Sequence, residues 1–338
     1  MKTIKERINE TVTIPEKYLS EYPPFPKSVK IELTSRCDLQ CFFCSLTFKE
    51  RTKGDIDRGF LFNLLDQVHD CGIEQVGLFW LGEPMLVKEL PEYVAYAKKI
   101  GIPYVFITTN GRLANPERVK PVFDAGLDSI KVSVNGADRE QYKKATGVDA
   151  FDMVLANLAK FKGIRGDRQK PAIYASSIFD PNSNRNIFEE VKPMVESYVD
   201  QHYGLRLYGE FTYDETVEGK ERPIEKVKVR SLEDMLPCWS VFTEPHISYH
   251  GHMSICYCDH DPSLFVADLN KLSFREAWHC EKFVEIRRAH LNKNVTGYAC
   301  ADCIAYKSFK ESWKENEKGT AAKQSGELKQ EVFKLTVI

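Results

Sequence analysis

Three cysteines in one short segment are the residues of this chain best suited to chemistry. Cys37, Cys41 and Cys44 have the spacing Cys-x3-Cys-x2-Cys and directly follow a strand-like apolar run at residues 29–33. Thiolates are the soft ligands that hold iron–sulfur clusters or zinc, and a closed site of either kind takes four of them. Three cysteines therefore predict a metal site with one open position. The alternatives are a zinc site completed by a distant fourth cysteine, or three buried thiols.

A second group of cysteines lies near the end of the sequence. It contains two separated pairs, Cys238 with Cys256 and Cys300 with Cys303. Four thiolates make a closed tetrahedral donor set, and their spacing alone does not distinguish zinc from an iron–sulfur cluster. Cys258 lies two residues beyond Cys256, so it is either an inert buried thiol, an alternative ligand or a hydrogen-atom donor that faces a substrate.

Two further cysteines, Cys71 and Cys280, lie on predicted helices outside these groups. Unpaired cysteine behaves as a small hydrophobic residue. We therefore predict that both are buried and inert.

Polar residues and turn formers follow the predicted strands at one rim. Gly82, Glu83 and Pro84 follow the second strand, where glycine lets the backbone approach a ligand and proline stops sheet pairing. Asn110 follows the third strand, and Ser133 lies near the end of the fourth. Their amide and hydroxyl groups suit hydrogen bonds to a ribose or a carboxylate. The alternative is that they are turn residues that cap the following helices.

The predicted sixth strand carries three polar residues at alternate positions, Arg206, Tyr208 and Glu210. Alternate residues of a strand share one face, so these side chains either line a cavity or lie on a solvated edge strand. We name all three as candidate catalytic residues together with Cys258.

The elements that must position these residues alternate along the chain. Apolar, β-branched runs alternate with helical patterns from about residue 29 to residue 211, which is typical of β-α units that form a parallel sheet. The predicted strands are residues 29–33, 75–80, 104–108, 129–134, 172–179 and 205–211. The predicted helices are residues 58–71, 90–100, 118–125, 151–162 and 185–198. Six units predict an α/β fold with a partial (β/α)6 TIM-like barrel, whose chemistry lies at the carboxyl ends of the strands.

The remaining segments predict the domain organisation. Residues 1–26 are expected to be an extended lead-in, because prolines at positions 23, 24 and 26 restrict the backbone. Residues 27–211 form the barrel, and the charged, aperiodic residues 212–236 form a linker. Residues 237–308 form a small α+β cluster-binding domain, and residues 309–338 form a polar tail.

Composition excludes several classes of partner. The 338 residues contain 47 Lys and Arg against 49 Asp and Glu, a formal net charge of -2. Nucleic-acid binders usually carry a basic face, so no nucleic acid is expected. No run reaches the roughly 20 apolar residues of a membrane span, and the first residues lack the apolar core of a signal peptide. Clustered cysteines favour metal binding in a reducing compartment, so we expect a cytoplasmic protein.

The first cysteine segment and the Gly82-Glu83-Pro84 turn together resemble the radical S-adenosylmethionine (SAM) superfamily. In that family the three cysteines hold a [4Fe–4S] cluster whose open iron is chelated by SAM. A Gly-Gly-Glu-Pro motif holds the methionyl amino group of SAM. Here Leu81 replaces the first glycine, which is tolerable because a backbone carbonyl is available from any residue. The resemblance implies that Ser133 contacts SAM, and we place Asn110 at the same rim as a cofactor-binding candidate.

The second cysteine group resembles the twitch domain, a truncated relative of the SPASM domain. The pattern Cys-x(9 to 15)-Gly-x4-Cys of that domain matches Cys238, Gly251 and Cys256, and no cysteine follows Cys303 as a full SPASM domain requires. The resemblance implies one auxiliary [4Fe–4S] cluster, fully ligated by Cys238, Cys256, Cys300 and Cys303.

The resemblance also implies an activity. An external one-electron reductant such as flavodoxin or ferredoxin reduces the cluster, and SAM yields a 5′-deoxyadenosyl radical that abstracts a hydrogen atom from the substrate. A fully ligated auxiliary cluster is suited to accept an electron, so we expect two-electron oxidation of a small polar substrate of sugar or aminocyclitol type. The alternatives are carbohydrate epimerisation, peptide modification, and a non-catalytic zinc or electron-transfer protein. The fold alone does not choose among these substrates.

Overall fold

The computed structural model describes residues 2–47, 52–179, 185–206, 236–258 and 264–303. Its centre is one sheet in the strand order β6-β5-β4-β3-β2-β1-β7-β8-β9. The first six strands are β1 (Ser28–Ile31), β2 (Gln75–Gly77), β3 (Tyr104–Thr109), β4 (Ser129–Ser133), β5 (Ala172–Phe179) and β6 (Gln201–Arg206). Each pairs in parallel with the next, and no ladder joins β6 to β1 within the described residues. The predicted α/β class with a parallel, partial barrel is confirmed.

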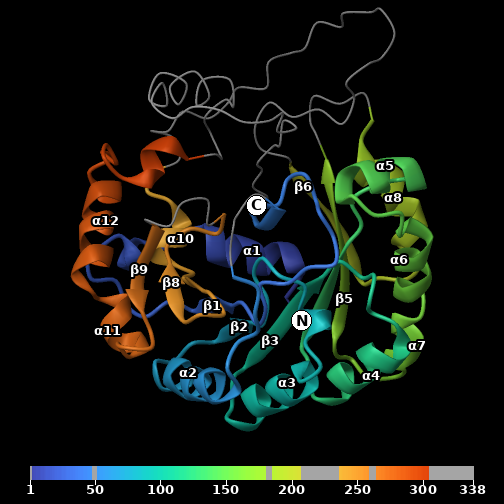
Figure 1. Cartoon of the computed structure of the whole chain (residues 1–338), viewed down its shortest axis with the longest axis horizontal. Coiled ribbons are helices and arrows are strands. Elements are labelled where there is room, and N and C mark those ends of the chain that lie inside the picture. The colour runs from blue at the N-terminus through green and yellow to red at the C-terminus, as the bar shows by residue number, and fades with distance from the viewer. Residues whose placement is uncertain (1, 48–51, 180–184, 207–235, 259–263, 304–338) are drawn as a thin grey trace, which may run out of the picture.

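Helices cover the outer side of this curved sheet (Figure 1). They are α2 (Arg58–Asp70), α3 (Leu90–Lys99), α4 (Pro116–Asp124), α5 (Arg139–Thr146), α6 (Phe151–Leu158), α7 (Phe161–Arg165) and α8 (Ile187–Val195). Several begin where a short polar side chain accepts a hydrogen bond from the first turn, as Asp57 does for α2 and Asn115 for α4. Their apolar faces pack on buried strand residues such as Val76, Val105 and Ile130. This packing directs the carboxyl ends of the strands to one rim.

The N-terminal segment corrects one prediction. Residues expected to be extended instead form α1 (Ile4–Val12), which starts with a capping box between Thr3 and Glu6. The helix lies on the inner side of the sheet (Figure 1). Ile4 and Ile8 line a cavity there, so the apolar spacing of this segment serves a helix rather than an extended chain.

The sixth strand begins earlier than predicted. Residues 205–211 are predicted as the strand, whereas β6 covers Gln201–Arg206. Its first four residues are half-buried and include Gln201 and His202, so they lack the apolar alternation that marks a strand in sequence. Tyr208, Glu210 and the predicted linker up to residue 235 lie outside the described residues, as does the predicted tail at 309–338.

The C-terminal segment extends the same sheet. Strand β7 (His246–Ile247) pairs in parallel with β1, and it is followed by β8 (His252–Ser254) and β9 (Phe265–Asp268) in antiparallel pairing. Helices α10 (Trp239–Phe242), α11 (Phe274–Trp278) and α12 (Glu281–Leu291) accompany these strands. Strand β1 therefore lies between β2 and β7, which brings the cysteine segment after β1 next to the C-terminal segment.

The longest helix in the described residues, α2, has 13 residues. Within the described ranges, no helix combines the length and the apolar character that crossing a membrane requires.

Candidate functional site

One cavity at the carboxyl ends of the strands gathers eight of the sixteen predicted site residues. It is lined by Cys37, Cys41, Cys44, Gly82, Glu83, Asn110, Ser133 and Cys258, together with other residues. Pro84 is not part of this lining; it is buried and begins the short 3-10 helix Pro84–Leu86. Arg206 is the last residue of β6.

Glu83 connects the end of β2 to the end of β3. Its side chain is only 3% exposed and accepts hydrogen bonds from Thr109 Oγ1 at 2.7 Å, Asn110 N at 2.7 Å and Met85 N at 2.9 Å. Burial raises the pKa of Glu83 to about 7, although these three hydrogen bonds lower it. Protein groups thus occupy most of the acceptor capacity of the carboxylate, so Glu83 fixes the shape of the rim.

Gly82 lies where the turn after β2 leaves no room for a side chain. A Cβ atom at this position would lie 1.8 Å from the carbonyl oxygen of Thr34, and the next residue, Glu83, donates its N–H to Arg36 O at 2.9 Å. The turn after β2 therefore packs directly on the segment after β1, and only glycine fits there. Leu81, which replaces the first glycine of the family motif, has its side chain accommodated in the cavity lining.

The cysteine segment is held in place by polar contacts. Asp38 accepts hydrogen bonds from Asn110 Nδ2 at 2.7 Å and from Arg112 Nη1 at 2.8 Å. The same Asn110 amide lies 4.0 Å from Cys37 Sγ. Further along the segment, Gln40 N donates to Thr146 O at 2.8 Å. Asn110 therefore positions the segment, while its direct contact with a cofactor stays a prediction.

The three thiols fit a positively charged metal centre. Burial, followed by the charges of Glu83 and Cys44, raises the pKa of Cys37 to about 12. Burial, followed by Cys44 and Cys37, also raises the pKa of Cys41 well above its usual value. Metal binding removes this penalty because the cation stabilises the thiolates. In the described part of the chain, no three His, Cys, Asp or Glu side chains converge on a single-ion position. What the three thiols have in common is that they line the same cavity.

The four cysteines of the second group also lie near one another. Cys238 directly precedes α10, Cys256 follows β8, and the other two lie at the 3-10 helix Ala299–Asp302. Burial and then the charge of Cys256 raise the pKa of Cys238 to about 12. The pKa of Cys300 is raised by burial and then by Cys256, Cys238 and Cys303. The four cysteines thus lie close enough to influence one another electrostatically, but no three of them converge on a single-ion position among the described residues, so their ligation of a metal stays a prediction.

The two groups are connected by residues that the sequence reasoning missed. Trp80 Nε1 donates a hydrogen bond to Tyr257 O at 2.7 Å. The Tyr257 side chain lines the cavity, and burial followed by the charge of Cys258 raises the pKa of its phenol. The available signal was the position of Tyr257 between Cys256 and Cys258, two residues already singled out.

Lys131 is the second missed residue. It lines the same cavity from β4, and burial lowers its pKa to about 8. A lone lysine between Ile130 and Val132 in an apolar strand is the sequence signal that would have found it.

Two family models match the chain. The radical SAM superfamily matches residues 31–191, and SPASM, an iron–sulfur cluster-binding domain, matches residues 238–304. These ranges contain all seven cysteines of the two groups. Together the two domains imply a SAM-binding [4Fe–4S] cluster and auxiliary iron–sulfur ligation.

Curated relatives match only part of the chain. A "Probable GTP 3',8-cyclase" of Saccharolobus islandicus is 36% identical over 132 residues, which is 39% of this chain and 42% of that protein. An uncharacterized protein of Methanocaldococcus jannaschii is 32% identical over 172 residues, or 51% of this chain and 54% of that protein. The matched regions thus span about half of these relatives.

Solved structures share the fold at low sequence identity. SuiB of Streptococcus suis has a TM-score of 0.62 at 18% identity, with 84% of this chain and 75% of that chain covered. BtrN in complex with AdoMet and 2-DOIA has a TM-score of 0.50 at 14% identity, with 80% and 88% covered. Both likenesses concern the fold alone.

Proposed function

The chain belongs to the radical SAM superfamily and carries a SPASM iron–sulfur domain, and from this premise we propose that it oxidises a small polar substrate of sugar or aminocyclitol type. Cys37, Cys41 and Cys44 would hold the cluster that SAM chelates. When bound, the cluster and SAM supply a 5′-deoxyadenosyl radical that removes a hydrogen atom from an unactivated carbon. The electron would come from an external reductant such as flavodoxin or ferredoxin.

The rim of the cavity supplies the candidate SAM contacts. Gly82 allows the turn after β2 to approach the cysteine segment, and Glu83 holds the ends of β2 and β3 in register. Ser133 and Asn110 face the same cavity from the neighbouring strand ends. In our proposal these residues orient SAM, and apolar residues such as Phe79 limit the access of water to the reacting carbon.

The observation that carries the oxidative proposal is the position of the Cys256 segment. Tyr257 and Cys258, which follow Cys256 directly, line the cavity that also contains Cys37, Cys41 and Cys44. A redox group held by Cys256 would therefore border the substrate. This adjacency supports net removal of two hydrogens, because an oxidised product requires an electron acceptor close to the reacting carbon.

One structural feature favours epimerisation as the second candidate. Cys258 is 8% exposed and lines the cavity, where a thiol would be placed to return a hydrogen atom to the substrate. Peptide modification and GTP cyclisation stay open because relatives of those kinds share the fold or part of the sequence. Analysis of the product distinguishes all four reactions.

Anaerobic reconstitution followed by product analysis tests the proposal. We expect about eight irons per chain, from two four-iron clusters, and formation of 5′-deoxyadenosine from SAM after reduction. Incubation with a metabolite extract should yield a compound two hydrogens lighter than its precursor. A protein that binds zinc and never cleaves SAM would be the non-catalytic alternative and would refute the proposal.

A further inference from the structure

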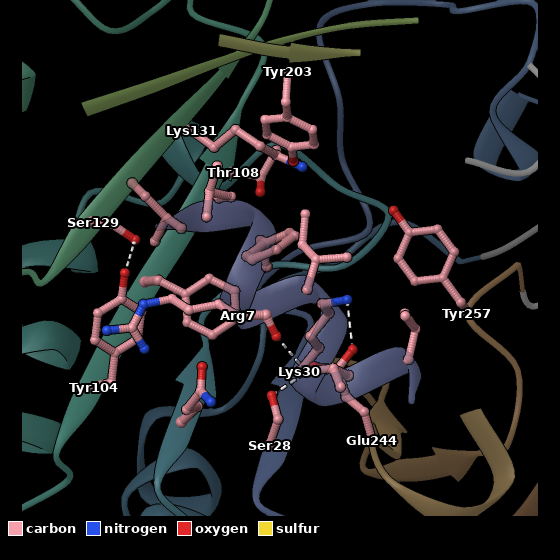
Figure 2. Close-up of a pocket in the computed structure, with 18 of the residues that line it drawn as sticks. Arg7, Ser28, Lys30, Tyr104, Thr108, Ser129, Lys131, Tyr203, Glu244 and Tyr257 are labelled. Carbon is pink, nitrogen blue, oxygen red and sulfur yellow. Dashed lines mark hydrogen bonds and ion pairs between the residues drawn. The ribbon is translucent and has the colours of Figure 1, made fainter. Parts of the chain in front are cut away.

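A second, inner cavity adjoins the first along the inside of the sheet. The two cavities share five lining residues, Phe79, Thr108, Lys131, Leu205 and Tyr257. The inner cavity reaches the amino ends of the strands at Ser28 and Ser129, and α1 closes that end through Ile4, Arg7 and Ile8. Figure 2 shows Lys131 with Tyr203 at one end of this space and Lys30 with Glu244 at the other. A substrate that reacts beside the cysteine segment would therefore have room to extend toward α1.

The charges that line this inner cavity are unbalanced. Its lining contains three cationic side chains, Arg7, Lys30 and Lys131, and one carboxylate, Glu244. Lys30 Nζ lies 2.6 Å from the Glu244 carboxylate, which also accepts a hydrogen bond from Ser28 Oγ at 2.5 Å. This pairing neutralises Lys30. Arg7 and Lys131 are left as an excess of two positive charges.

Arg7 presents its guanidinium to the cavity. Its Cζ lies 3.4 Å from the centre of the Tyr104 ring, which fixes the plane of the guanidinium. The Arg7 Nε atom is buried and has no hydrogen-bond partner among the residues that the structure describes. Tyr104 itself is occupied, because its hydroxyl donates to Ser129 Oγ at 2.7 Å. Arg7 therefore retains donor capacity that the described protein groups do not use.

Lys131 is the second unneutralised cation. Its Nζ lies 5.6 Å from the centre of the Tyr203 ring, and no carboxylate of the described residues lies within ion-pair distance. The groups that act on it are the Tyr203 ring and the more distant, ion-paired Glu244. The Tyr257 phenol lines the same cavity. Burial lowers the pKa of Lys131 to about 8, which is the consequence expected of a half-buried cation without a partner.

We propose that the inner cavity binds an anionic group of the substrate, a carboxylate or a phosphate, between Arg7 and Lys131. A half-buried cation without a partner is less stable than a paired one, and an anion held by both side chains supplies that partner. The inference rests on the proposed function, which places the reacting carbon at the cysteine end. Of the two substrate types named there, it favours an acidic or phosphorylated sugar over an aminocyclitol, because an amine in the inner cavity would be repelled.

Competitive acetylation of lysines tests this inference on the reconstituted holoprotein. Acetic anhydride modifies only neutral amines, so its rate at Lys131, read by peptide mass spectrometry, reports both protonation and access. Inorganic phosphate or malonate at twice its dissociation constant should lower this rate about threefold. Neutral glycerol should leave the acetylation rate of Lys131 unchanged. Phosphate and malonate should leave the acetylation rate of the exposed Lys160 unchanged. Protection by phosphate alone or by malonate alone identifies the source of the anion.

Variants on α1 separate the proposed site from a general salt effect. Arg7→Gln should abolish the protection, Arg7→Lys should retain part of it, and Lys5→Gln, which removes an exposed charge from the same helix, should retain all of it. Absence of protection by both anions, or equal protection in Arg7→Gln and Lys5→Gln, would overturn the inference. Formation of 5′-deoxyadenosine is measured in the same preparations, so failure of the radical SAM proposal is recognised independently.

Discussion

The indole Nε1 of Trp80 donates a hydrogen bond to the backbone carbonyl of Tyr257 over 2.7 Å, across 177 positions of the chain. Trp80 immediately precedes the turn with Gly82 and Glu83, and Tyr257 lies between Cys256 and Cys258. The bond therefore joins the rim that we assign to SAM with the segment that we assign to the auxiliary cluster. It fixes one wall of the cavity between the two cysteine groups.

Trp80→Phe should loosen this wall. The substitution keeps most of the ring but leaves the Tyr257 carbonyl without its donor, which should lower the free energy of unfolding by about 1–3 kcal/mol. Trp239→Phe is the matched control, because the Trp239 indole makes no hydrogen bond within the described residues although its ring lines the inner cavity. Denaturant unfolding of both variants measures the difference. Equal losses would show that the hydrogen bond contributes nothing.

Gly82→Ala should prevent SAM binding. The added Cβ would lie 1.8 Å from Thr34 O, so the turn must move away from the cysteine segment. Gly163→Ala in α7 adds a methyl group with no atom within 4 Å and should be neutral or stabilising by up to about 1 kcal/mol. SAM binding to the reconstituted proteins and their thermal unfolding are the measurements. Wild-type affinity for SAM in Gly82→Ala would contradict the assigned role of this turn.

Glu83 should make stability depend on pH. Burial raises its folded pKa to about 7, above the usual glutamate pKa of 4.5. The protonated form is thus favoured on folding, and its contribution is fully present below pH 4.5 and is lost as the pH rises toward 7. The loss should reach about 3 kcal/mol at most, since each pKa unit is worth about 1.4 kcal/mol.

Glu83→Gln provides the test, because glutamine does not titrate. In urea unfolding, the free energy of unfolding of the wild type should fall relative to that of the variant as the pH rises from 5 to 8. Glutamine also places an N–H donor against groups that themselves donate to Glu83. At low pH the variant should therefore be less stable than the wild type. A difference that stays constant across this range would show that Glu83 titrates as an ordinary carboxyl.

Cys258→Ser should separate oxidation from epimerisation. If the reaction is an oxidation, the variant keeps about eight irons and forms the same product two hydrogens lighter than the substrate. Cys71→Ser, at the end of α2 and outside the cavity lining, is the matched control. If a dehydrogenated product appears only in Cys258→Ser and an isomer forms in the wild type, the thiol is a hydrogen-atom donor and the reaction is an epimerisation.

Much of the sheet could be predicted from the sequence, because buried parallel strands are continuous apolar runs. The predicted segment at residues 172–179 coincides with β5, and the segment at 104–108 falls one residue short of β3. The cysteine segment and Gly82 were found because their spacing carries chemistry. Helix α1 was missed although Thr3 and Glu6 form a recognisable capping box.

Long-range contacts could not be predicted in this way. The pairing of β1 with β7, which aligns Lys30 with His246, joins segments whose sequences contain no sign of each other. The charge balance of the inner cavity likewise depends on the packing of α1 against the sheet, which places Arg7 over Tyr104 of β3 and in the same cavity as Lys131 of β4. Such features follow from tertiary packing rather than from local periodicity.

Cleavage of SAM by the reduced holoprotein is the most direct test of the central claim that Cys37, Cys41 and Cys44 leave one iron open to SAM. The account predicts 5′-deoxyadenosine from the wild type and about eight irons per chain. It predicts no 5′-deoxyadenosine from Cys41→Ala, which should retain the roughly four irons of the auxiliary cluster. A fully reconstituted wild type that never forms 5′-deoxyadenosine, or a Cys41→Ala variant that forms it at the wild-type rate, would contradict the account.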